Sequence, residues 1–101
     1  MSVDVFLGLP FNIGSYALFT HIVAQILGCS VGKLIFVGGD THVYLNHRQQ
    51  CAELVSREPK ELPTLVMPSF HSLKECLSFG VEDFKLLNYE PHSAIRAPMA
   101  V

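Results

Sequence analysis

The chain has 101 residues, of which 50% are hydrophobic and 16% are charged. A chain of this length forms a single small domain or a part of a larger one. The hydrophobic content excludes a disordered tail, which would be polar and highly charged. Because so short a chain buries only a modest share of its surface, many of these apolar groups would stay in contact with water. The composition therefore predicts a partner chain, an oligomer or a missing part.

The formal net charge of -2 argues against a protein that follows the phosphates of DNA, because such a protein needs a clustered basic face. The three cysteines, Cys29, Cys51 and Cys76, lack paired spacing, so we expect no disulfide framework and a cytoplasmic location. A secretory signal is not expected either, because no basic residue precedes the first apolar run.

The first part of the sequence predicts strands on either side of a long helix. Val3–Leu7 is typical of a short strand, and Pro10 suits the first turn of a helix, where its missing N–H loses no hydrogen bond. Apolar residues then occupy nearly every face as far as Leu27, which predicts a helix buried in the middle of a protein. Gly28 would close this helix in a left-handed conformation. The β-branched and aromatic run Leu34–Val37 predicts a buried strand.

The same helix is apolar enough to raise the question of a membrane span. A span needs roughly twenty mainly apolar residues, whereas this segment contains Asn12, Ser15, His21 and Gln25. We therefore expect no membrane association.

The remaining sequence predicts shorter elements. Asp40–Leu45 is expected to form a strand in which Asp40, His42 and Tyr44 alternate onto one face. The further expected elements are a helix over His47–Arg57 capped by Asn46, a strand over Thr64–Met67, a brief helical turn capped at Ser72, and a strand over Val81–Leu87. Because no repeat or internal boundary is visible, we expect one domain of the α/β or α+β class.

His42 and Tyr44 are the first candidates for a binding site. Each ends in a group that donates and accepts hydrogen bonds, and the pair Gly38–Gly39 leaves room beside them. The two side chains would bind a ligand hydroxyl or carbonyl. The alternative is an ordinary strand face in contact with solvent, which the pattern alone favours.

Two further polar residues have apolar neighbours in the sequence. Asn12 lies at the start of the apolar helix, where its amide must find partners, either in the preceding loop or on the edge of a planar ligand. The carboxylate of Asp4 needs donors if it is buried, and structural pairing is the commoner fate of such an acid.

Neither a metal site nor a nucleophile follows from the residues alone. His42, His47 and Cys51 could suggest zinc, because His47 and Cys51 would share one helix face, but no fourth ligand occurs at a recognisable spacing. Cys29 follows a predicted helix end, where the helix dipole disfavours a thiolate, and the other cysteines lack an activating context.

Two long segments resemble thymidylate synthase. Asp4–Tyr16, with the sequence DVFLGLPFNIGSY, resembles the segment that follows the catalytic cysteine of that family, and Gly38–His47, GGDTHVYLNH, resembles its second hallmark stretch. Four shorter segments match the C-terminal pattern of the family in order: Ser56–Pro59, Glu82–Phe84, Tyr89–His92 and Ala97–Val101. The resemblance covers the whole chain and implies the α+β thymidylate synthase fold of a homodimer, with a mixed sheet packed on a long buried helix.

The resemblance also implies an activity, namely the reductive methylation of deoxyuridylate (dUMP) to thymidylate (dTMP) with methylenetetrahydrofolate as cosubstrate. The implied dUMP-binding residues are Ser2, Asp4, Asn12, His42 and Tyr44. Asn12 would bond the uracil edge, whereas the related family that acts on deoxycytidylate has an acid there. His42 and Tyr44 would hold the deoxyribose hydroxyl, and Ser2 would help to hold the phosphate.

The implied folate-binding residues are Asp4, Leu7, Gly8, Phe11 and Ala100. Among them, Asp4 would bond the pterin. The last residues, Met99–Val101, would fold over the bound ligands and exclude water.

The departures from the family pattern concern the covalent chemistry. The nucleophile of the family is a cysteine in the tripeptide Pro-Cys-His, which does not occur here. Met1 stands in the place of an arginine that grips phosphate, and Val3 in the place of a cysteine. We therefore expect a C-terminal fragment that is inactive alone, with an N-terminal complement or a homo-oligomer as its partner. The alternative is a non-catalytic remnant, or an interaction or nucleotide-binding module.

Overall fold

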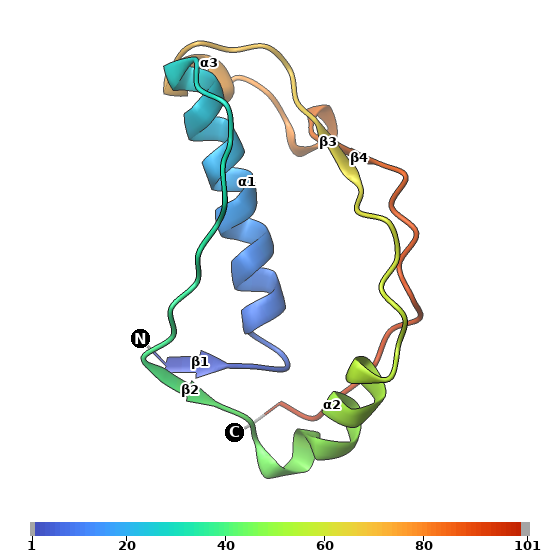
Figure 1. Ribbon diagram of the computed structural model, residues 1–101. Coiled ribbons are helices and arrows are strands. Elements are labelled where there is room, and N and C mark those ends of the chain that lie inside the picture. Colours follow the sequence, from blue (N-terminus) through green and yellow to red (C-terminus); the bar gives the residue numbers. More distant parts are fainter. Residues whose placement is uncertain (1, 100–101) are drawn as a thin grey trace. The chain divides into compact units, whose positions relative to one another are not determined.

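The computed structural model describes residues 2–99, which combine helices with short strands (Figure 1). The elements in chain order are β1 (Ser2–Asp4), α1 (Leu9–Leu27), β2 (Asp40–His42), the 3-10 helix η1 (Leu45–His47), α2 (Arg48–Val55), β3 (Thr64–Val66), α3 (Leu73–Cys76), the 3-10 helix η2 (Val81–Asp83) and β4 (Lys85–Leu87). This composition confirms the predicted α+β class. The chain divides into two compact units: Met1–Tyr16, Ile35–Pro59 and His92–Val101 form the first, and Ala17–Leu34 and Lys60–Pro91 the second.

A parallel ladder of β1 and β2 forms the centre of the first unit. Val3 pairs with Thr41 in this ladder and Asp4 pairs with His42, while Val3 is buried with 4% of its surface exposed. The strand predicted over Val3–Leu7 therefore ends earlier, at Asp4. The reason is local, because the Asp4 carboxylate accepts hydrogen bonds from the backbone of the residues that follow and favours a turn.

The long helix α1 confirms the predicted element, and so does its C-terminal cap. Gly28 adopts a positive φ of 68°, and the N–H of Cys29 donates to the Ala24 carbonyl at 2.8 Å. The predicted burial of the helix is wrong for this chain, since none of its residues is buried and Phe11 is 77% exposed. A helix with apolar residues on nearly every face needs neighbours on every face, and the described residues do not supply them.

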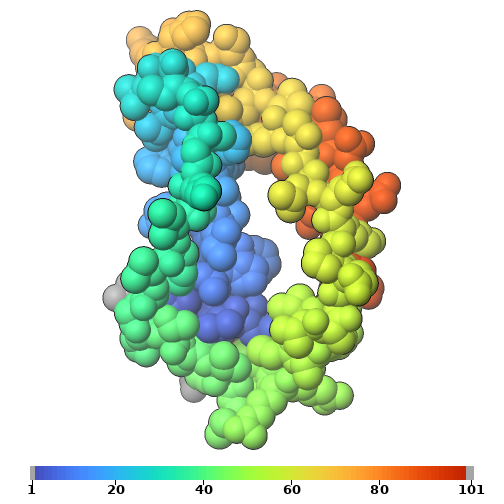
Figure 2. Space-filling model, viewed as in Figure 1, coloured from blue at the N-terminus to red at the C-terminus, as the bar shows by residue number. Residues whose placement is uncertain are grey.

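The segment after α1 is extended but forms no ladder with any described residue. The strand predicted over Leu34–Val37 is therefore wrong. A β-branched run becomes a strand only where a second backbone pairs with it. Within the second unit, Ser30–Gly32 instead lines a surface hollow of about 280 Å³ together with Phe19 and Val23 of α1. Figure 2 shows the segment after α1, in teal, against the end of the helix.

The helix of the first unit begins differently from the prediction. The strand predicted over Asp40–Leu45 ends at His42, and the N–H of His47 donates to the Tyr44 carbonyl at 2.9 Å to form η1. The residue before α2 is thus His47, and its side chain makes no capping bond, so the predicted cap at Asn46 is wrong. A 3-10 turn immediately after Tyr44 moves the helix start beyond the reach of Asn46.

An antiparallel ladder of β3 and β4, with Leu65 opposite Leu86, belongs to the second unit. The strand predicted over Thr64–Met67 is confirmed as β3. Of the strand predicted over Val81–Leu87, only the last part, β4, forms a strand. The first part forms the turn η2, because the Asp83 carboxylate accepts the Gly80 N–H at 2.8 Å and stabilises that turn.

Phe70 forms the core of the second unit. Its side chain is fully buried, and its ring centroid lies 6.3 Å from that of Phe79 and 6.4 Å from that of Phe84. The predicted cap at Ser72 is confirmed, since its Oγ accepts the Glu75 N–H at 3.2 Å and begins α3.

Candidate functional site

The β1–β2 ladder brings two predicted site residues together. Asp4 lies opposite His42 in the parallel pairing, and the N–H of Val5 donates to the His42 carbonyl at 3.0 Å. The imidazole of His42 also approaches the Asp40 carboxylate, with 3.6 Å between Nδ1 and Oδ1. Because 32% of the His42 side chain is exposed, the ring remains accessible to a ligand.

Tyr44 stays beside His42 although it lies outside the strand. The two ring centroids are 5.0 Å apart and the rings meet edge to face at 83°. Tyr44 keeps an extended backbone, with φ of -65° and ψ of 141°, so the two side chains lie together although the ladder ends at His42. The two polar tips therefore share one side of the first unit.

Asp4 stabilises the turn between β1 and α1 through one of its two carboxylate oxygens. Its Oδ1 accepts the N–H of Phe6 at 3.2 Å and of Leu7 at 3.3 Å. Among residues 2–99, no hydrogen bond engages Oδ2, and 26% of the side chain is exposed. The carboxylate thus combines a fixed position with an available acceptor.

His47 is a polar residue buried within the first unit. Its side chain is fully buried, and Nε2 lies 2.7 Å from the Pro98 carbonyl oxygen. Since a carbonyl only accepts, Nε2 must carry the hydrogen. On the other edge, Nδ1 lies 4.0 Å from Asp4 Oδ1 and makes no hydrogen bond. The rings of Phe6 and Tyr44 are each centred 5.6 Å from it.

Asn12 lies in the first part of α1 and is half-buried. Its backbone N–H donates to the Gly8 carbonyl at 3.0 Å, whereas its side-chain amide bonds to none of the described residues. The loop partner that the sequence left open is therefore not used. The space beside Gly8 favours glycine, because a Cβ there would lie in tight contact with the Asp4 carbonyl oxygen, at 3.1 Å.

The remaining predicted residues have different positions in the first unit. Ser2 is exposed at the start of β1, Leu7 is half-buried in the turn, and Phe11 is exposed on α1. Ala100, like Met1, lies outside the described residues.

No group of three His, Cys, Asp or Glu residues between 2 and 99 is arranged to hold a metal ion. The cysteines are free, with Cys29 exposed, Cys51 half-buried and Cys76 buried. No helix within these residues is both long and apolar enough to cross a membrane. The side chains of Asp4, Asn12, His42 and Tyr44 can donate hydrogen bonds to a polar ligand and accept hydrogen bonds from it.

Comparison with known proteins agrees over the whole chain. Residues 1–101 match the thymidylate synthase family model. The chain is 52% identical to the probable thymidylate synthase of Escherichia phage T5, over 98% of this chain and 36% of that protein. The crystal structure of thymidylate synthase from T4 phage superposes with a TM-score of 0.88 at 49% identity, over 99% of this chain and 38% of that chain.

A bacterial structure gives the same result. The thermostable thymidylate synthase A from Bacillus subtilis superposes with a TM-score of 0.87 at 35% identity, over 99% of this chain and 35% of that chain. The chain therefore spans little more than a third of the length of these relatives. The chain belongs to the thymidylate synthase family.

Proposed function

We propose that this chain supplies part of a thymidylate synthase site, binding dUMP and methylenetetrahydrofolate for the reductive methylation that yields dTMP. The observation that carries the proposal is the ladder pairing of Asp4 with His42, with the Tyr44 ring against the His42 ring. This arrangement supports a folate contact through Asp4 and a sugar contact through His42, two residues that the same ladder holds opposite each other.

His42 and Tyr44 are proposed to bind the deoxyribose hydroxyl. A hydroxyl donates one hydrogen bond and accepts others, which matches an imidazole nitrogen and a phenol side by side. The edge-to-face contact with the Tyr44 ring, with centroids 5.0 Å apart, restricts the orientation of the imidazole. The sugar would thus meet polar groups whose positions are set before binding.

Asn12 is proposed to recognise the base. An amide offers an acceptor oxygen and two N–H donors, and the uracil edge offers an N–H donor beside carbonyl acceptors. Because the side-chain amide of Asn12 bonds to none of the described residues, it is available for this pairing. Ser2, exposed at the start of β1, would contribute to the phosphate contact.

Asp4 is proposed to hold the pterin of the folate. Its Oδ2 is not bonded within residues 2–99 and accepts from an N–H, so the residue fits the group. Methylenetetrahydrofolate, when bound, supplies the transferred carbon and the hydride. Leu7, Gly8 and Phe11 would line its pocket. Met99–Val101 would close over the ligands and exclude water.

A complement to this chain is proposed to supply the nucleophile. The relatives are far longer than this chain, which covers 36% and 38% of two of them. Large apolar side chains are exposed, among them Phe11 at 77% and Val37 at 86%, and a folded partner would cover them. The partner is a chain that corresponds to the rest of the relatives, with self-association as in a homo-oligomer, in the cytoplasm and without DNA.

Release of tritium from dUMP labelled at C5 tests the proposal. The purified chain alone should release none, and a mixture with the uncovered part of a family member should release tritium in the presence of methylenetetrahydrofolate. Release by the chain alone would overturn the proposal. A silent mixture would favour a non-catalytic remnant, and calorimetric heat on adding dUMP to the chain would then identify a nucleotide-binding module.

A further inference from the structure

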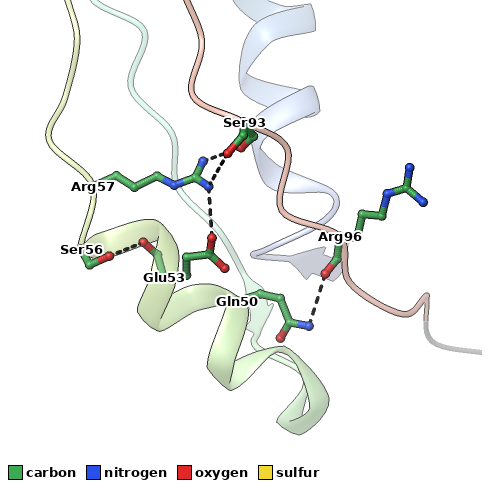
Figure 3. Close-up of polar contacts among 6 residues, drawn as sticks. All are labelled: Gln50, Glu53, Ser56, Arg57, Ser93 and Arg96. Carbon is green, nitrogen blue, oxygen red and sulfur yellow. Dashed lines mark hydrogen bonds and ion pairs between the residues drawn. The ribbon is translucent and has the colours of Figure 1, made fainter.

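The last described segment of the first unit runs along α2 and the residues that flank it, in the opposite chain direction, and polar bonds join the two (Figure 3). The bonds pair His92 Nε2 with the Glu58 carbonyl at 2.8 Å, Arg57 Nη1 with the Ser93 carbonyl at 2.6 Å, Gln50 Nε2 with the Arg96 carbonyl at 3.4 Å and His47 Nε2 with the Pro98 carbonyl at 2.7 Å. We call the segment 92–98 the strap. Its contacts advance along the strap as they go back along the helix.

Arg57 provides the attachment near the start of the strap. Besides the Ser93 carbonyl, its guanidinium donates to Ser93 Oγ at 3.4 Å and to Glu53 Oε1 at 3.2 Å. Glu53 lies one helical turn earlier and orients the guanidinium. Only 19% of the Arg57 side chain is exposed, so these bonds are partly shielded from water.

His47 provides the attachment at the other end and differs from the rest in its burial. Its imidazole is fully buried between the Phe6 and Tyr44 rings, so it has a single position. The only partner of Nε2 among the described residues is the Pro98 carbonyl. A donor in a fixed position that bonds a main-chain carbonyl positions the backbone directly, whatever side chain the residue carries.

We propose that His47 is a positioning residue that fixes the point at which the chain leaves α2, so that the strap stays seated whether or not ligands are bound. The inference concerns residues 92–98 and goes beyond the proposed function. The opposing arrangement is a strap that is loose in the free chain and becomes ordered only when ligands bind.

Backbone 15N relaxation of the full chain tests the inference without any turnover. In the wild-type chain, the amides of Ser93 and Arg96 should have order parameters of about 0.8 or more, both with and without dUMP. The amide of Met99 should have a lower order parameter. His47→Phe keeps an aromatic ring in the site but has no donor. In a Gln50→Ala background, which removes the bond from Gln50 to the Arg96 carbonyl in every protein compared, it should lower the order parameter of Arg96 below about 0.6.

A rescue separates the hydrogen bond from packing. His47→Gln offers an amide N–H at a similar reach and should restore the Arg96 value, which a role in packing alone would not predict. Arg57→Gln, at the other end, should release Ser93 but leave Arg96 ordered. It keeps the test informative if the His47 variants do not fold.

Two results would overturn the inference. One is a wild-type strap whose order parameters fall below about 0.6 in the free chain and rise only with ligand. The other is an unchanged Arg96 in His47→Phe. Because the readout needs no enzyme activity, a mixture without turnover would count against the proposed function and leave this result standing.

Discussion

Asp4 and His42 lie opposite each other in the parallel ladder of β1 and β2, and the backbone bond from the Val5 N–H to the His42 carbonyl, 3.0 Å long, adjoins that pair. Two residues from distant parts of the sequence are therefore brought together by main-chain atoms. Substitution of either side chain leaves those atoms in place. Effects on binding should consequently be separable from effects on folding.

His42→Ala should weaken dUMP binding in the complemented enzyme by about tenfold, because one hydrogen bond is worth about 1.4 kcal/mol. The unfolding midpoint in urea should change little, since the ladder is a backbone structure. Titration of dUMP measures the first effect and circular dichroism the second. Val43→Ala, a neighbouring exposed position, is the control and should leave dUMP affinity unchanged. Equal affinities in all three proteins would contradict the proposed sugar contact.

Asn12→Asp should shift the base preference from dUMP toward deoxycytidylate. A carboxylate only accepts hydrogen bonds, so it repels the uracil O4 and suits the exocyclic amino group of cytosine. Binding of both nucleotides to the complemented enzyme checks this. Asn46→Asp introduces the same charge at an exposed position and should leave the ratio of the two affinities unaltered. The assignment of Asn12 fails if the two variants behave alike.

Gly28→Ala and Gly14→Ala should have opposite effects on stability. Gly28 closes α1 with φ of 68°, a conformation that costs an alanine about 1–2 kcal/mol. Gly14 lies within α1, where a Cβ would meet nothing within 4 Å. Alanine there should stabilise the helix by about 0.5–1 kcal/mol. Urea unfolding of both variants compares the signs, and a shared sign would refute the cap.

Phe70→Ala should destabilise the chain by about 3–5 kcal/mol, the usual loss for a buried phenylalanine. Its ring is fully buried and lies 6.3 Å from the Phe79 ring and 6.4 Å from the Phe84 ring. Leu77→Ala, at a position that is 75% exposed, should change stability by less than about 0.5 kcal/mol. Urea midpoints that coincide for the two variants would show that Phe70 is not the core of the second unit.

Local features of the fold were predictable from the sequence because their causes are local. Gly28 ends α1 since few residues other than glycine tolerate its backbone conformation, and Ser72 begins α3 through a bond to the residue three positions on. Leu34–Val37 has the composition of a strand but forms none, because pairing depends on a second segment. The composition of a segment shows which backbone conformations it can adopt, and pairing with another segment decides whether a strand forms.

The proximity of His42 and Tyr44 was predictable from their spacing, and the structure confirms it. Their role in binding rests on the family resemblance and stays a prediction. His47 was missed as a structural donor because its burial depends on Phe6 and Pro98, which lie far away in the sequence. Asn12 was predicted to be buried and is half-buried. That its side-chain amide bonds to none of the described residues follows only from the folded chain.

The central claim is that this chain holds substrate while another chain holds the nucleophile. The most direct measurement uses dUMP with fluorine in place of the hydrogen at C5. Because fluorine cannot leave as the proton does, the covalent adduct of the attacking thiolate is trapped. The mixture of chain, complement and methylenetetrahydrofolate would be digested and its adduct located by mass spectrometry. The account predicts an adduct on the cysteine of the complement, formed only when this chain is present. An adduct on Cys29, Cys51 or Cys76, or one formed by the complement alone, would contradict it.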